Sequence, residues 1–183
     1  MEKGSGNKTL NMVYIALFAV IMAICAWIVI PMAVPFTMQT FAVFLAVGVL
    51  GGKRGTAAVV LYLLLGMIGL PVFSGFTGGI GILLGNTGGY LLGFLWLSLI
   101  MWGMEKLFGK KVWVLGVSMV LGLIACYAFG TLWFLYMYAK SSGTIGAVAV
   151  LGYCVLPFII PDVIKMILAL FVRKRLLRAV KLN

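Results

Sequence analysis

One acidic and one basic residue stand in an otherwise apolar run near the end of the chain. In VLPFIIPDVIKMILALF, residues 155–171, Asp162 and Lys165 are three positions apart, so a helix places them on one face, close enough to pair. A charged residue near the middle of a bilayer costs roughly 2.5–3.5 kcal/mol, and apolar replacements of an ion pair are often as stable. The pair either joins helices as an internal salt bridge or lines a binding cavity. In a cavity, Lys165 would meet an acidic ligand or keep Asp162 ionised, and Asp162 would accept N–H bonds.

Other residues offer little for catalysis. The chain has no histidine and three acids, Glu2, Glu105 and Asp162, so neither a carboxylate pair nor a metal cluster is expected. Its three cysteines stand singly, without C-x-x-C spacing. The segment GVLGGKRG, residues 48–55, lacks the glycine spacing and the Ser/Thr of a Walker A loop. We predict a non-enzymatic protein with no cofactor or metal, in which any ATP hydrolysis belongs to another chain.

The composition is that of an integral membrane protein with an all-α fold. Of the 183 residues, 64% are hydrophobic and 9% are charged, and the mean hydropathy is +1.23. A spanning helix needs about 20 apolar residues, so we expect one six-helix domain over residues 1–183, with a cytoplasmic tail at 1–9 and a basic tail at 174–183. The predicted spans are 10–30, 38–51, 55–70, 84–104, 112–138 and 145–175. The second and third are short, and a break at Pro157 or Pro161 would divide the last into a short outer helix and the sixth span.

The basic residues predict an orientation. Twelve of the fourteen fall into four clusters that six spans place on one side: Lys3 and Lys8; Lys53 and Arg54; Lys106, Lys110 and Lys111; and Arg173, Lys174, Arg175, Arg178 and Lys181. Lysine and arginine accumulate in cytoplasmic loops, so both termini are predicted to be cytoplasmic, in a multi-pass protein of the bacterial cytoplasmic membrane. The net charge of +11 therefore reflects membrane topology and does not indicate a nucleic-acid partner.

Two uncharged connections lie on the opposite side, at residues 31–41 and 70–94. Irregular backbone at membrane depth must be covered by protein or line a cavity, so these connections form either a lid over the outer end of the bundle or hairpins on its surface. Within the second, four glycines recur every four residues, a spacing that permits close helix contact: Gly81, Gly85, Gly89 and Gly93. Asn86 and Tyr90, one helical turn apart beside these glycines, are candidate ligand contacts, although Asn86 could instead cap a helix.

The first span carries a stripe of small residues. Ala16, Ala19, Ala23 and Ala26 are spaced by 3, 4 and 3 positions, which keeps them on one side of a helix. Such a stripe packs another helix of the same chain or, if it faces lipid, docks a partner membrane protein.

Four segments together resemble the BioY family, the biotin-specific substrate-binding (S) components of energy-coupling factor (ECF) transporters. These are PFTMQTF (35–41), KRGTAAVVLYLLLGMIGLPVF (53–73), GGIGILLGNTGGYLLGF (78–94) and LPFIIPDVIKMILA (156–169). The resemblance runs from about Ala16 to Arg173 in the same order along the chain. It implies a six-helix S-component bundle that captures biotin on the outer side. It also implies assembly with a transmembrane coupling subunit and two cytoplasmic ATPase subunits.

The resemblance further implies roles for individual residues. Asp162 would accept the ureido N–H groups of biotin, Asn86 would complement the ring, and Lys165 would hold Asp162 or a ligand oxygen. Further wall or lid contacts would be Tyr90, Trp133, Phe36 and Gln39. The alanine stripe would dock on the coupling subunit. Two alternatives stay open, a self-sufficient facilitator or channel for biotin or another small anion, and a membrane anchor without a ligand.

Overall fold

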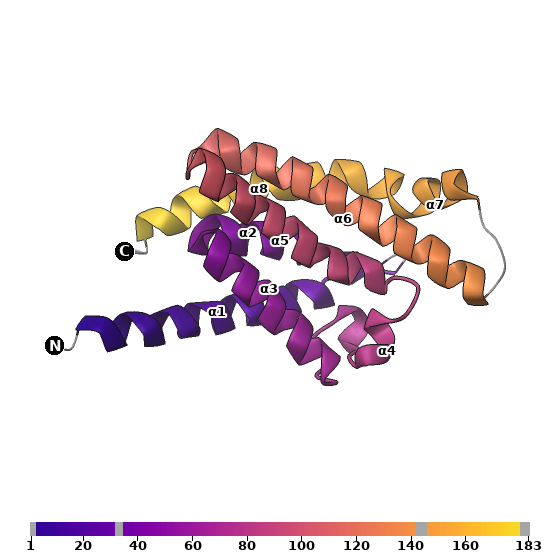
Figure 1. Ribbon diagram of the computed structural model, residues 1–183, viewed down its shortest axis with the longest axis horizontal. Coiled ribbons are helices and arrows are strands. Elements are labelled where there is room, and N and C mark those ends of the chain that lie inside the picture. The colour runs from indigo at the N-terminus through magenta and orange to yellow at the C-terminus, as the bar shows by residue number, and fades with distance from the viewer. Residues whose placement is uncertain (1–2, 32–34, 142–145, 180–183) are drawn as a thin grey trace.

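The computed structural model describes residues 3–31, 35–141 and 146–179, which form a bundle of helices (Figure 1). The helices are α1 (Lys3–Trp27), α2 (Gln39–Leu50), α3 (Gly52–Met67), α4 (Ile80–Leu83), α5 (Gly88–Phe108), α6 (Val112–Ser141), α7 (Ala147–Cys154) and α8 (Leu156–Ala179). A 3₁₀ turn, η1 (Ser74–Phe76), precedes α4. Two short antiparallel strands, β1 (Val29–Ile30) and β2 (Phe36–Thr37), pair Val29 with Thr37. The predicted all-α class is confirmed.

The long helices run along the molecule. In Figure 1 the start of α1 and the end of α8 lie at the left end, and α4 and α7 lie at the opposite end. The region that the structure describes contains four segments long and apolar enough to cross a bilayer: Lys8–Trp27, Gly88–Phe108, Val112–Lys140 and Val148–Arg178. Helices α2 and α3 have 12 and 16 residues, about 18 and 24 Å at 1.5 Å per residue, shorter than a hydrocarbon core of about 30 Å. The chain is a multi-pass membrane protein, and its six-span topology stays a prediction.

Several predicted boundaries are wrong by a few residues. Helix α1 begins seven residues before position 10 and ends at Trp27, because the chain then turns into β1. Helix α5 begins at Gly88 and not at 84, because residues 84–87 form a turn after α4. The last segment is divided, as predicted, into a short helix and a long one. The break is at Val155 and not at either predicted proline, since Pro161 lies inside α8 and Pro157 lies in its first turn, where a proline leaves no needed N–H unpaired.

Glycine allows α5 and α6 to pack closely. A Cβ at Gly89 would lie 2.2 Å from Cβ of Trp133, and one at Gly93 would lie 2.7 Å from Sγ of Cys126. Both separations are too short for a side chain other than hydrogen. By contrast, a Cβ at Gly81, in α4, would have no neighbour within 4 Å. The predicted ridge of four glycines is therefore divided by the turn before α5, and its last two members make the interhelical contact.

Candidate functional site

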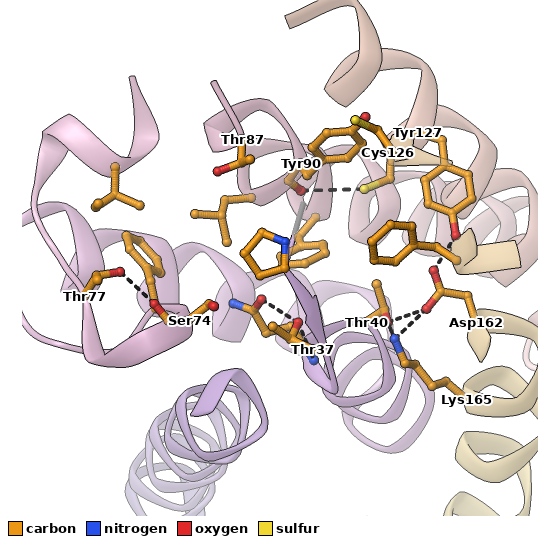
Figure 2. A pocket seen from close by; sticks show the side chains of 18 residues that line it. Thr37, Thr40, Ser74, Thr77, Thr87, Tyr90, Cys126, Tyr127, Asp162 and Lys165 are labelled. Atoms are coloured by element: carbon orange, nitrogen blue, oxygen red, sulfur yellow. Dashed lines mark hydrogen bonds and ion pairs between the residues drawn. The ribbon is translucent and has the colours of Figure 1, made fainter. Parts of the chain in front are cut away.

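A cavity of about 210 Å³ lies between α2, α5, α6 and α8 (Figure 2). Both outer connections contribute to its lining, the first through Thr37 and the second through Phe73, Ser74 and Thr77. The first connection forms the β1–β2 hairpin, and in the second Phe73 pairs with Thr77 in an antiparallel bridge. The connections are thus hairpins that also cover a cavity, which agrees with the lid interpretation.

The second connection is held in place by the end of α1. The indole Nε1 of Trp27 donates to the carbonyl oxygen of Pro71 at 3.0 Å. The Trp27 ring also stacks on Phe76 with 4.8 Å between ring centroids. These contacts tie the connection to a long helix, so opening it requires both to be broken.

Asp162 and Lys165 lie in the wall of this cavity as a buried ion pair. Their side chains are 2% and 5% exposed, and Nζ of Lys165 donates to Oδ1 of Asp162 at 2.7 Å. The hydroxyl of Thr40 donates to the same carboxylate oxygen at 2.9 Å and accepts from Nζ of Lys165 at 3.1 Å. The hydroxyl of Tyr127 donates to Oδ2. Hydroxyls from α2 and α6 therefore donate to both oxygens of the carboxylate (Figure 2).

The hydrogen bonds leave the carboxylate able to accept more. An ionised carboxylate has about four acceptor positions, and the three contacts from Thr40, Lys165 and Tyr127 occupy three of them. The pair borders open space and is not sealed within packed side chains. The pair therefore forms an internal salt bridge and also leaves one acceptor position at the cavity, which suits an N–H donor.

Lys165 also contacts an aromatic ring. Its Nζ lies 4.1 Å from the ring centroid of Phe36 in β2, within the range of a cation–π interaction. The Phe36 ring packs in turn near Phe158, with 6.1 Å between centroids. Phe158 is a lining residue and Phe36 is not. Phe36 thus lies beside the predicted site and contacts the cavity through Lys165.

Gln39 lines the cavity and is 4% exposed. Its Nε2 donates to the hydroxyl of Tyr62 at 2.5 Å, and that hydroxyl donates to the carbonyl oxygen of Val72 at 3.0 Å. Its Oε1 accepts from the hydroxyl of Thr37 at 2.7 Å. This chain of hydrogen bonds joins α2, α3 and both outer connections, so the amide of Gln39 is held at a defined place in the wall.

The remaining predicted residues separate into two groups. Tyr90 lines the cavity, and its hydroxyl lies 3.2 Å from Oγ1 of Thr131. Asn86 and Trp133 are not among the residues that line this cavity, and their roles as ligand contacts stay predictions. The indole of Trp133 donates to the carbonyl oxygen of Gly85 at 3.0 Å and is held at the α5–α6 contact.

Asn86 lies in the turn between α4 and α5. It lies two residues before α5, so the position that enters the cavity is that of Thr87. Thr87 also occupies the N-cap position of α5, without a side-chain cap bond. The capping alternative for Asn86 is therefore wrong, whereas its role as a ligand contact stays a prediction.

Two residues that hydrogen-bond to Asp162 are absent from the sequence-based set, Thr40 and Tyr127. Thr40 lies in the uncharged connection at residues 31–41, and nothing in the sequence distinguishes it from the other polar residues there. Tyr127 occurs in a long apolar run, and a buried phenol usually has a hydrogen-bond partner. The tyrosine could therefore be expected to have a hydrogen-bond partner, but the sequence does not identify Asp162 as that partner.

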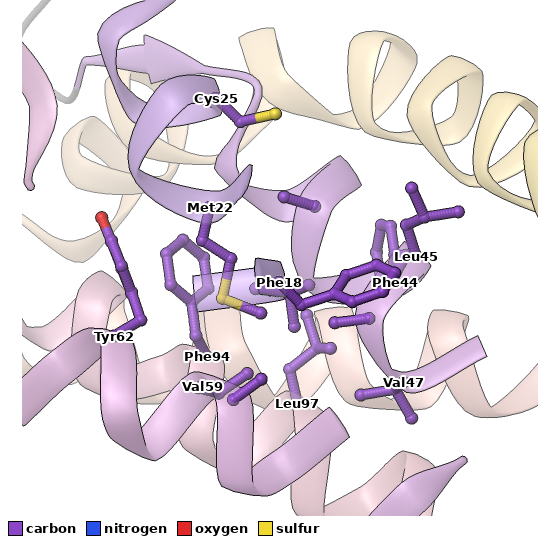
Figure 3. Packing of buried hydrophobic residues seen from close by; sticks show 14 of the residues in the cluster. Phe18, Met22, Cys25, Phe44, Leu45, Val47, Val59, Tyr62, Phe94 and Leu97 are labelled. Atoms are coloured by element: carbon purple, nitrogen blue, oxygen red, sulfur yellow. The ribbon is translucent and has the colours of Figure 1, made fainter. Parts of the chain in front are cut away.

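The alanine stripe of α1 is mostly internal. Three of its members are at most 5% exposed: Ala19, Ala23 and Ala26. Ala16 is exposed. Figure 3 shows Phe18 and Met22 of the same helix within the core cluster that includes Phe44. These three alanines pack within the chain, where α1 contacts α2 and α3, and docking of the stripe on a partner stays a prediction.

A model of the BioY family matches residues 1–182. The chain belongs to the BioY family. It is 40% identical to the biotin transporter BioY of Thermotoga maritima over 163 residues, which cover 87% of this chain and 91% of that protein. It is 38% identical over 175 residues to the biotin transporter BioY2 of Lactococcus lactis subsp. cremoris, with 94% and 93% of the two chains covered.

A solved structure confirms the fold. The crystal structure at 2.1 Å of the S component for biotin from an ECF-type ABC transporter matches this BioY-family chain with a TM-score of 0.82 and 28% identity. The match covers 97% of this chain and 95% of that one. The family resemblance seen in the sequence and the S-component-like bundle are thereby both confirmed.

Proposed function

We propose that this chain is the S component of an ECF transporter and binds biotin in the 210 Å³ cavity. It is a transport subunit and not an enzyme. The observation that carries the proposal is the buried Asp162–Lys165 pair, which borders a cavity in a chain of the BioY family.

Biotin has polar and apolar parts that match the polar and the apolar lining residues of the cavity. Its ureido ring has two N–H donors and one carbonyl acceptor, and an apolar chain joins the bicycle to a carboxylate. The carboxylate of Asp162, which retains acceptor capacity, receives a ureido N–H group. The apolar chain lies against aromatic and aliphatic lining residues, namely Phe73, Leu91, Phe94 and Phe158. Lys165 donates to Oδ1 of Asp162, and Gln39 and Tyr90 complete the polar and aromatic wall.

The size of the cavity favours a small ligand. Pockets for drug-sized molecules are roughly 300–1,000 Å³, and this one is about 210 Å³. Burial in such a cavity excludes water from the ion pair, and a hydrogen bond to a charged group is stronger in that environment than in water. A partly open cavity lined by residues of both hairpins is consistent with capture of biotin.

The orientation and partners follow from the charge distribution and the family. The end with the basic clusters faces the cytoplasm by the positive-inside rule, so the hairpins and the cavity face outward across the bacterial cytoplasmic membrane. A transmembrane coupling subunit and two cytoplasmic ATPase subunits supply the energy for uptake. The chain itself binds the vitamin.

The test has two parts. Calorimetric titration of the purified chain in detergent is expected to show binding of one biotin per chain, with Lys140→Gln, a change in an exposed residue, as the control. Proteoliposomes with the chain alone are expected not to accumulate biotin until the coupling and ATPase subunits and ATP are present. Accumulation by the chain alone would instead identify a self-sufficient facilitator, and absence of binding would refute the proposal.

A further inference from the structure

A second and larger cavity lies at the end of the bundle opposite the hairpins. Its volume is about 560 Å³, and its lining residues lie where α2 and α5 end, where α3 and α6 begin, and in the last turns of α8. These helix ends lie at the left end of the bundle in Figure 1. The basic residues that line it come from three separate segments: Lys53, Arg54, Lys110, Lys111 and Arg173. Among its lining residues Glu105 is the one acid. The lining thus carries five positive charges and one negative charge.

Glu105 is already engaged. Its Oε2 accepts from the backbone N–H of Gly52 at 2.5 Å, at the start of α3. Its Oε1 lies 3.7 Å from Nζ of Lys110, whose side chain is 76% exposed. The carboxylate therefore offsets at most one of the five positive charges, and the cavity keeps an excess of positive charge suited to an anion.

Arg173 is positioned by a contact with α2. Its Nε donates to the carbonyl oxygen of Gly48 at 2.6 Å. A Cβ at Gly48 would lie 3.2 Å from Cδ of Arg173, so glycine gives the arginine room to lie against the helix. This bond uses one of the five N–H donors of the guanidinium. The others are available to phosphate oxygens, which arginine binds in a bidentate manner.

The cavity also has apolar walls, which argue for an amphiphilic ligand. They are formed by Val47, Leu50, Met101, Val114, Leu115 and Leu177. The adjoining α5–α6 junction exposes large apolar side chains beside its lysines: Leu107 at 76%, Phe108 at 53%, Val112 at 60% and Trp113 at 59%. Interleaved basic and apolar residues of this kind are typical of a membrane interface. A free phosphate would use the charges alone, whereas a phospholipid would use both features.

We propose that this cavity binds the phosphate headgroup of an anionic phospholipid, with its acyl chains beside the exposed apolar residues of the α5–α6 junction. Basic pockets between helices at the cytoplasmic side of membrane proteins bind such headgroups. The site is separate from the biotin cavity, and the proposal does not depend on what that cavity binds.

The test compares two charge-matched double variants of the full chain. Arg54→Gln/Lys111→Gln removes two charges from the cavity, and Lys174→Gln/Arg178→Gln removes two charges at the same end but outside it. Each protein in neutral detergent is titrated with phosphatidylglycerol, phosphatidylcholine or inorganic phosphate, and occupancy is measured by native mass spectrometry. Thermal unfolding of both variants verifies that they are folded.

Wild-type protein is expected to bind phosphatidylglycerol in preference to phosphatidylcholine. Each basic residue near an anionic lipid surface contributes about fivefold, so the cavity variant is expected to bind about thirtyfold more weakly, and the outer variant like wild type. Equal losses in both variants would indicate diffuse surface charge and overturn the proposal. Competition by millimolar inorganic phosphate would assign the site to a free anion. Lipid binding unchanged in the cavity variant, with loss of association to a partner protein, would assign it to protein docking.

Discussion

Replacing both members of the ion pair separates its structural role from its role in binding. Lys165→Met leaves Asp162 charged and buried with two hydroxyl donors, and Asp162→Asn leaves a buried ammonium without its counter-ion. Breaking a buried pair on one side costs about 3–5 kcal/mol. At roughly 2–4 °C per kcal/mol for a chain of this size, each single variant is expected to lower Tm by about 6–20 °C.

The double variant Asp162→Asn/Lys165→Met is expected to recover most of this stability, because replacing both charges of a buried pair is often neutral. The new amide oxygen can still accept from the hydroxyl of Thr40 or Tyr127. Biotin binding is not expected to recover. A hydrogen bond to a charged group contributes about 1.5–3 kcal/mol net, which corresponds to a loss of about 10- to 150-fold in affinity.

The assay measures Tm in detergent and the Kd for biotin by calorimetry on wild type, both single variants and the double variant. Lys140→Gln is the control for a charge change outside the site. In the double variant, Tm is expected to return close to the wild-type value while the affinity for biotin stays low. A double variant that is stable and binds biotin with wild-type affinity would refute this expectation, and would leave the pair as a salt bridge only.

Two further predictions concern packing and topology. Gly89→Ala is expected to destabilise the protein by about 1–3 kcal/mol through overpacking, because the new Cβ would lie 2.2 Å from Cβ of Trp133. Gly81→Ala is the control, because its Cβ would have open space and should leave Tm unchanged. Equal Tm values for the two variants would contradict the close α5–α6 contact. In a variant without native cysteines, a membrane-impermeant maleimide is expected to label Lys140→Cys in intact cells and Lys53→Cys only after permeabilisation. The reverse labelling would invert the predicted orientation.

The sequence by itself determined the features that depend on local order along the chain. Hydropathy and the four basic clusters predict a helical membrane bundle, and i, i+3 spacing places Asp162 and Lys165 on one face. The division of the last segment into a short outer helix and a long one also follows from local signals, since prolines favour the first turn of a helix. These properties need no knowledge of which helices are neighbours.

Only the tertiary structure decided which side chains meet. Thr40 reaches Asp162 across 122 positions, and Tyr127 reaches it across 35. The burial of Ala19 and the position of Asn86 outside the cavity lining are likewise results of packing. The physical reason is that a helix in lipid is apolar on every side, so its sequence carries little amphipathic signal to separate the inner face from the outer one. Helix rotation is then set by close packing and by the few buried hydrogen bonds, which join residues far apart in the chain.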